Sequence, residues 1–304
     1  MSTHAAPATS DGRHVLSIFG SIRPYERGWL RRDVVAGITL AALAIPEVMG
    51  YTKIAGTPVI TGLYTILIPI LAFAIFGSSR HLVVGGDSAT AAIMYAGIAS
   101  LGISGLQPYT SQWLALASLS ALLAAAFLVL ARVARLGFLA NFISRTVLVG
   151  FLTGVGIQVA LGQAAGLFGV PSPHVSLNHV SGTLIKFWDT LTELGQISWA
   201  TTAVSAAVLA ILIVFARWVK AIPGGLVAVI GLIALSWIFD FASHGISTLG
   251  SVPSGLPHIG VPRGIAWSDT TGLLATAASM FLVILAQSAA TSRAYAVKYQ
   301  ERFV

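Results

Sequence analysis

The stretch RHLVVGGDSAT, residues 80–90, lies between two long apolar segments and brings polar side chains into an otherwise apolar part of the chain. The glycine pair 85–86 interrupts the backbone, and the Asp-Ser pair at 87–88 is typical of a helix N-cap, here for a helix running through 89–93. A helix that begins inside a bilayer presents free N–H groups and partial positive charge, both of which suit an anion. A tight turn with an ordinary cap at the membrane surface fits the same residues, and the stretch alone favours neither interpretation.

The composition is that of a membrane protein. Of the 304 residues, 56% are hydrophobic and 9% are charged, whereas soluble domains carry about 25% charged residues. The formal net charge of +7 would suggest a nucleic-acid partner for a soluble protein. Here arginines facing an anionic cytoplasmic leaflet explain the charge, so we expect membrane lipid and no nucleic acid as the surroundings. Residues 1–32 contain five arginines and no long apolar run, which predicts a cytoplasmic N-terminal segment and not a signal peptide.

Seven segments are long and apolar enough to cross a bilayer, which takes about 20 residues of helix. They are 33–52, 57–76, 113–132, 140–168, 198–217, 223–242 and 269–292, with 87–101 as a shorter piece. The sequence therefore predicts an all-α polytopic membrane protein with a short half-helix after the glycine break.

The basic residues orient these segments in the inner (cell) membrane. With the N-terminus in the cytoplasm and the half-helix counted as a crossing, fourteen of the 17 lysines and arginines fall at inner ends. Only Lys53, Lys186 and Arg263 fall at outer ends. This positive-inside bias predicts a cytoplasmic N-terminus.

Two spans carry polar residues that could take part in transport chemistry. Glu47 follows Pro46 inside the first span, and Tyr51 lies one turn later on the same face. Carboxylates inside a membrane are costly and mark functional sites, although a position near the outer interface is the alternative for Glu47. In the last span, Gln287 and Thr291 lie on one polar stripe. Hydroxyls there could instead bond back to their own helix.

Motifs for enzymatic chemistry are missing from the sequence. There is no zinc pattern, P-loop, dinucleotide fingerprint or nucleophile elbow, and cysteine is absent. We therefore predict that the protein is not an enzyme and has neither a cofactor nor a metal site.

Three stretches together resemble the sulfate permease (SulP) family of anion transporters. They are DVVAGITLAALAIPEVMGYTKIAG at 33–56, GLYTILIPILAFAIFGSSRHLVVGGDSA at 62–89 and VPSGLP at 252–257. The second contains the family's FGSSRHL run almost letter for letter. Three motifs in order, over about residues 30–300, are far more specific than any one of them.

The resemblance implies seven plus seven transmembrane segments in two inverted repeats, with half-helix N-termini meeting at the membrane midplane. On this plan residues 1–32 form a cytoplasmic segment, and residues 33–135 form core-domain segments one to four, with the half-helix from about 87. Residues 136–243 form gate-domain segments five to seven. An external loop at 244–268 then leads to segment eight and a cytoplasmic end at 269–304. The chain stops at Val304, before the remaining segments and the STAS domain common in the family, so we expect a fragment. For the full-length protein we expect a homodimer.

The family's binding residues can be carried over position by position. Glu47 stands where the first helix usually has a glutamine, Tyr51 where an aromatic side chain often packs, and Gln287 where many bacterial members have a coupling acid. The expected substrate-binding residues are Glu47, Tyr51, Gly86, Asp87, Ser88, Ala89, Thr90, Gln287 and Thr291.

Two departures from the family pattern lead to a hypothesis about coupling. The usual glutamine is an acid at Glu47, and the frequent acid is an amide at Gln287. The first and eighth segments are symmetry mates in an inverted repeat, so both positions should border one central cavity. We expect a buried coupling carboxylate at Glu47, with H+ or Na+ as the coupling ion and Asp87 as a second candidate. The alternative is that coupling has been lost.

The resulting functional expectation is the N-terminal part of a secondary transporter for small inorganic or carboxylate anions, of the sulfate, bicarbonate or dicarboxylate class. Alternating access would move segments one to four and eight against segments five to seven. The alternatives are a nucleobase–cation symporter of the same architecture, an uncoupled anion channel or exchanger and, for this chain alone, a membrane scaffold that does not transport.

Overall fold

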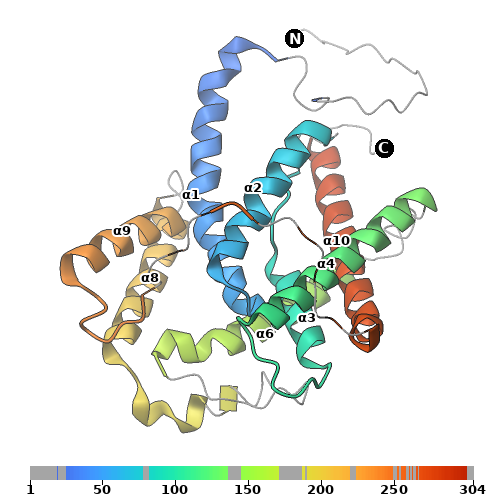
Figure 1. Ribbon diagram of the computed structural model, residues 1–304. Helices are drawn as coiled ribbons and strands as arrows, with labels where there is room; N and C mark the ends of the chain where they lie inside the picture. The colour runs from blue at the N-terminus through green and yellow to red at the C-terminus, as the bar shows by residue number, and fades with distance from the viewer. Residues whose placement is uncertain are drawn as a thin grey trace.

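The computed structural model describes residues 19, 25–77, 82–135, 145–170, 187–188, 190–219, 224–248, 252, 255–257, 260, 262, 265 and 267–299. These residues form helices and no strand. The main helices are α1 (Leu30–Ala55), α2 (Val59–Phe76), α3 (Ser88–Ala99), α4 (Ser111–Val133), α6 (Arg145–Phe168), α8 (Trp199–Trp218), α9 (Gly224–Phe239) and α10 (Trp267–Tyr299) (Figure 1). Short 3-10 helices cover Arg27–Trp29 and Leu194–Gln196.

The predicted all-α membrane architecture is confirmed. Each expected apolar segment coincides with one of these helices. Among the described residues, five helical stretches are long and apolar enough to cross a membrane, namely Arg27–Ala55, Val59–Phe76, Ser111–Val133, Trp199–Trp218 and Ser268–Ser292. The span expected at 223–242 is shorter than predicted, because α9 ends at Phe239 and Asp240 adopts a left-handed backbone with φ 41°.

The half-helix predicted after the glycine break is α3. Its 12 residues reach only about 18 Å at 1.5 Å per residue, well short of the roughly 30 Å hydrocarbon core. Residues 82–87 before it form no helix or strand and lie along α2 (Figure 1). Gly85 packs close to Ile66, and Gly86 lies near Val48 and Thr65. Before the helix starts, the segment therefore runs beside α1 and α2.

Helices α1 to α4 and α10 pack together and hold the buried core. One cluster joins Ile98 of α3, Trp113 and Leu116 of α4 and Leu273 of α10, each at most 1% exposed. A second cluster joins Ala124 and Met280, again from α4 and α10. Although α10 follows α4 by more than a hundred residues, it packs along both α3 and α4.

Beside this core, α8 packs against both α6 and α9 (Figure 1). They meet it through the contacts of α6 with α3 and α10 and of α9 with α1. No residue of α8 is buried. The described chain thus consists of a buried five-helix group and a more exposed three-helix group.

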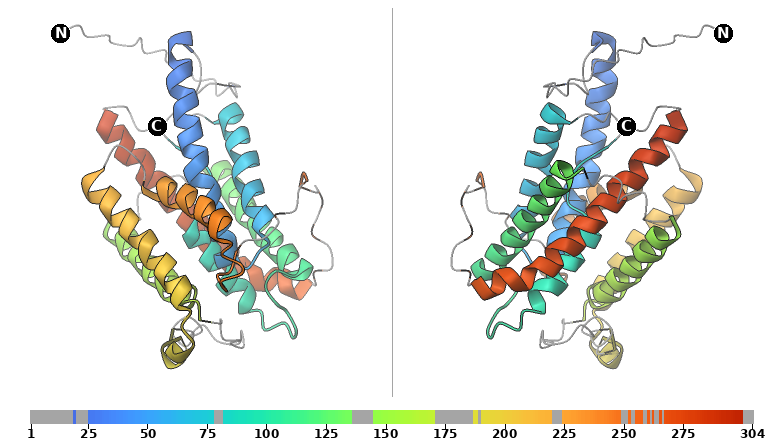
Figure 2. Two further views of the ribbon diagram at one scale, coloured as in Figure 1. Left: turned by 90° about the vertical axis from the view of Figure 1, so that its left-hand side faces the viewer. Right: turned by 90° about the vertical axis from the view of Figure 1, so that its right-hand side faces the viewer.

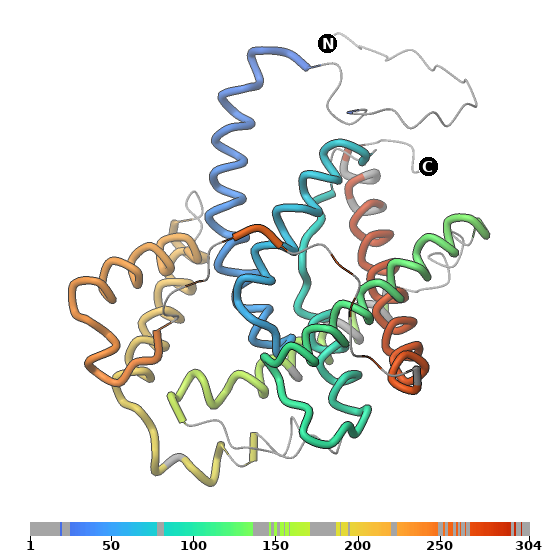
Figure 3. Tube along the Cα trace, in the orientation of Figure 1, coloured from blue at the N-terminus to red at the C-terminus, as the bar shows by residue number. Residues whose placement is uncertain are grey.

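Three helix ends lie on one side of the molecule. The first turn of α1, the last turn of α2 and the C-terminal end of α10 share this side in all views (Figures 1 and 2). The tube trace shows the turn from α1 into α2 on the opposite side (Figure 3). The count of basic residues assigns these same three ends to the cytoplasm, and the orientation in the membrane stays a prediction.

Close contacts fix α1 against α2 and α4. The Trp113 indole Nε1 donates a hydrogen bond of 2.9 Å to the Ala55 carbonyl oxygen, which pairs a carbonyl at the end of α1. Gly56 follows with φ 68° and ends the helix in the left-handed conformation that glycine favours. At Gly62 the two helices approach so closely that an added Cβ would lie 2.6 Å from the Val48 carbonyl oxygen.

The substitution Gly62→Ala is expected to lower the free energy of unfolding by about 1–3 kcal/mol, because the new methyl group overpacks the α1–α2 contact. The matched control is Gly150→Ala in α6, where an added Cβ meets no atom within 4 Å. Since alanine is the better helix former, this control should keep or raise stability. Thermal unfolding of the full-length variants in detergent measures both effects. Equal melting temperatures for the two variants would contradict the close contact at Gly62.

Candidate functional site

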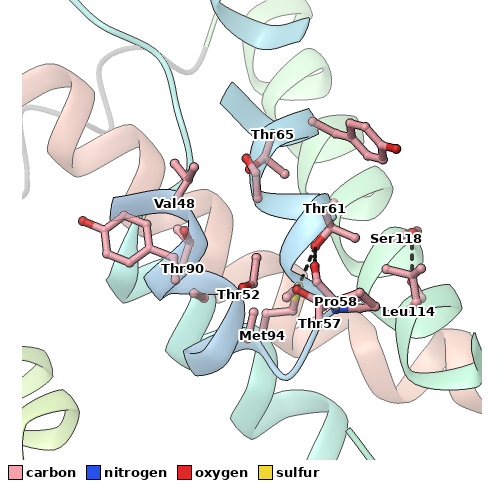
Figure 4. Close-up of a pocket in the computed structure, with 18 of the residues that line it drawn as sticks. Val48, Thr52, Thr57, Pro58, Thr61, Thr65, Thr90, Met94, Leu114 and Ser118 are labelled. Carbon is pink, nitrogen blue, oxygen red and sulfur yellow. Dashed lines mark hydrogen bonds between the residues drawn. The ribbon is translucent and has the colours of Figure 1, made fainter. Parts of the chain in front are cut away.

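A cavity of about 600 Å³ opens between α1, α2, the start of α3, and α4. Six threonine and serine side chains line it, from four helices and the turn before α2: Thr52, Thr57, Thr61, Thr65, Thr90 and Ser118 (Figure 4). The phenols of Tyr51 and Tyr64 also line it, and Met94 and Met280 belong to its apolar wall. Among the described lining residues Asp87 alone carries a charge. The surface of the cavity is therefore mostly apolar, with several hydroxyl groups and no basic side chain among its described lining residues.

The start of α3 enters this cavity with its cap in place. Asp87 has an extended backbone, and its Oδ2 accepts hydrogen bonds of 3.1 Å from the amides of Ala89 and Thr90. The Thr90 hydroxyl donates back to the Asp87 carbonyl oxygen at 3.0 Å. The predicted N-cap is confirmed. Gly86, Asp87 and Thr90 line the cavity, whereas Ala89 is buried and Ser88 is outside the lining.

Gln287 of α10 reaches the same cap. Its Nε2 donates a hydrogen bond of 3.3 Å to Asp87 Oδ2, across 200 positions of sequence. The structure thereby brings two of the expected site residues into direct contact. Thr291, one turn further along α10, is exposed and outside the cavity lining.

Glu47 and Tyr51 lie on one face of α1, as their spacing predicts. The Tyr51 hydroxyl donates a hydrogen bond to the Glu47 carboxylate. Tyr51 lines the cavity, but Glu47 is exposed and outside the lining, so the burial expected for this carboxylate is not found. The reason is helical phase: the buried stripe of α1 includes Ala44 and Val48, and Glu47 lies about 100° around the helix from Val48.

A polar stripe on α2 contributes to the cavity and was not predicted from the sequence. Thr57, Thr61 and Thr65 follow one another at four-residue spacing, at the start of a very apolar span. Thr61 Oγ1 lies 3.0 Å from Thr57 Oγ1 and 2.7 Å from the Pro58 carbonyl oxygen, and Thr65 Oγ1 donates to the Gly62 carbonyl oxygen at 2.8 Å. The i, i+4 pattern that pointed to Gln287 and Thr291 would have identified this stripe as well.

Part of the opening motif lies outside the described residues. The structure does not describe Arg80 and His81, which belong to the FGSSRHL run. No group of three or more potential metal ligands occurs in the part of the chain that the structure describes.

Several apolar helices around a cavity, with a half-helix opening into it, define a multi-pass membrane transport protein. The sequence model of the sulfate permease family matches residues 30–304. The chain belongs to this family, whose members are transporters and not enzymes.

Relatives agree with this assignment, and a solved structure has a similar fold. A probable sulfate transporter of Mycobacterium tuberculosis is 35% identical over 276 residues, covering 91% of this chain and 47% of the relative. Probable sulfate transporter 3.3 of Arabidopsis thaliana is 33% identical over 76% of this chain and 37% of its own length. The inward-facing structure of the murine anion transporter Slc26a9 matches with a TM-score of 0.78 and 20% identity, over 93% of this chain and 49% of that one. The chain thus spans about half the length of these proteins.

The substitution Asp87→Ala is expected to destabilise the full-length protein by about 0.5–2 kcal/mol, because the Ala89 and Thr90 amides lose their acceptor. Asp87→Asn keeps an acceptor oxygen, and asparagine caps helices about as well as aspartate, so its loss should be much smaller. Thermal unfolding in detergent measures both variants. A loss of the same size in Asp87→Asn would contradict a role of this side chain as a cap.

Proposed function

We propose that the full-length protein carries small anions across the cytoplasmic membrane by secondary active transport. The observation that carries this proposal is the cavity itself, where the start of a half-helix meets hydroxyl groups from α1, α2 and α4. A hydroxyl hydrogen rotates about its C–O bond, so it can leave a backbone acceptor and point to an anion instead. Hydroxyl donors can bind an anion without a cluster of arginines, and such binding is weak enough to permit release.

The mechanism we propose is alternating access, with α1 to α4 and α10 as one body and α6, α8 and α9 as the other. The distribution of buried residues supports this division, because the large buried clusters lie within the first body. The second body meets it through few helix pairs. A thin contact between two packed groups is what a rocking motion requires.

We also propose a cytoplasmic N-terminus in the inner membrane. The positive-inside count supports this orientation. So does the shared side of the α1 start, where Arg27, Arg31 and Arg32 lie, and the α10 end, where Arg293 and Lys298 lie (Figures 1 and 2).

The function is tested with full-length protein in liposomes, by uptake of radiolabelled sulfate, bicarbonate, fumarate and uracil. We expect uptake of at least one anion and no uptake of uracil. Uptake of uracil would instead indicate the nucleobase–cation symporter. Thr65→Val removes a cavity hydroxyl while keeping the shape of the side chain. Because a hydrogen bond to a charged group contributes about 1.5–3 kcal/mol, its KM for the transported anion should rise about tenfold to a hundredfold.

The matched control for this variant is Thr39→Val. Thr39 also bonds back to its own helix, to the Val35 carbonyl oxygen at 2.9 Å, but lies on α1 outside the cavity. Its KM should remain that of the wild type. Equal KM values for Thr65→Val and Thr39→Val would exclude the cavity as the anion site.

We propose Glu47 as the carboxylate that couples transport to a cation. Its bond with Tyr51, which lines the cavity, gives the carboxylate a connection to the site. If Glu47 carries the coupled proton, Glu47→Gln should abolish the pH dependence of uptake, since an amide does not titrate in this range. Uptake is measured as a function of pH in the wild-type protein and in the variant. An unchanged pH profile would leave Glu47 without a coupling role.

A further inference from the structure

The carboxylate of Asp87 lies at the point of the cavity where an anion would be expected to bind. Its Oδ2 already accepts the amide hydrogens of Ala89 and Thr90, each at 3.1 Å, and the Gln287 side-chain amide at 3.3 Å. These donors at the start of α3 are therefore occupied by the protein's own anion. A transported anion must bind beside this carboxylate, through the remaining donors of the cavity.

The local charge around that position is negative. The described groups around the start of α3 are Gln287 on α10, which donates to Asp87, and Tyr51 and Thr65, which lie near Gly86. Glu47, outside the cavity lining, accepts the hydrogen bond of the Tyr51 hydroxyl. All are uncharged except Glu47, which adds a second carboxylate. The start of a helix contributes only about half a positive charge, less than one carboxylate takes away. No lysine or arginine is among the described residues that line the cavity.

We propose that Asp87 makes this cavity select singly charged anions over doubly charged ones. The inference rests on the proposed anion transport and adds the substrate class. Coulomb repulsion is proportional to the charge of the ligand, so a dianion meets twice the repulsion from Asp87 that a monoanion meets. Hydroxyl donors serve both kinds of anion and do not offset this difference. Gln287 increases the difference in repulsion between the two kinds of anion, because its hydrogen bond holds the Asp87 carboxylate at the cavity.

The test compares two tetrahedral oxyanions that differ by one unit of charge, sulfate and perchlorate. Each is used as a competitor of the radiolabelled anion that the wild-type protein takes up, with full-length protein in liposomes. The measured quantity is the ratio of the two half-inhibitory concentrations. Sulfate and perchlorate differ in hydration, but that difference is the same for every variant and cancels when ratios are compared.

In Asp87→Asn the half-inhibitory concentration of sulfate should fall about tenfold more than that of perchlorate, because removing one charge gives twice the gain in binding free energy for the dianion. Asp87→Ser makes the same charge change with another strong N-cap, and covers the case in which the asparagine variant does not fold. Asp33→Asn is the matched control. This aspartate lies at the start of α1, where it accepts a hydrogen bond of 2.8 Å from Tyr25, outside the cavity.

The expected result is a shift of the ratio toward sulfate in both Asp87 variants and none in Asp33→Asn. A wild-type ratio in both Asp87 variants, with uptake retained, would overturn the inference and leave the transport function standing. A shift of the same size in Asp33→Asn would overturn it too, because the effect would then be one of overall charge. Failure of the wild-type protein to take up any anion would count against the proposed function, and this is seen before any variant is compared.

Discussion

A helix that begins inside a membrane has no water to bind its first N–H groups, so the protein must supply the acceptors. In this chain the Asp87 carboxylate does so for the Ala89 and Thr90 amides. Much of the surrounding structure follows from that constraint. The residues before Asp87 form a non-helical segment that lies beside α1 and α2. The helix that follows can then start in the middle of the five-helix group, with a cavity at its end.

The same carboxylate connects parts of the chain that are distant in sequence. Gln287 donates to it from α10, and further along α3 the absence of a side chain at Gly97 makes room for Thr276 of α10. The two contacts fix the eighth expected segment along the half-helix. A change in the environment of Asp87 would therefore alter the packing of α10 as well as the cavity. This gives the eighth segment a structural reason to move with the first four.

The sequence was informative where the signals are local. The half-helix and its cap could be predicted because glycines followed by Asp-Ser specify a break and a helix start within a few residues. The contact between Gln287 and Asp87 could not be predicted in that way, because it joins positions 200 residues apart and depends on how α10 packs. The resemblance to a family placed both residues among the expected substrate-binding residues, without a contact between them. Glu47 shows the limit of spacing arguments, since its pairing with Tyr51 was predictable but its exposure depends on which face of α1 packs against α2. The four-residue spacing of the threonines at the start of α2 is also a local signal, although the apolar residues around them predict only a membrane span.

The charge on Asp87 calls for an explanation beyond capping. Serine and asparagine satisfy the same two amides about as well as aspartate, and a charged cap gains only about 0.3–1 kcal/mol more from the helix dipole. Against this, an aspartate at the centre of a membrane helix costs about 2.5–3.5 kcal/mol on insertion scales. Stability alone therefore favours a neutral cap at this position. A carboxylate facing a cavity whose described lining includes no basic side chain is explained, in our proposal, by what it does to the ligand. It lowers the affinity for every anion, which assists release, and it does so most for those that carry two charges.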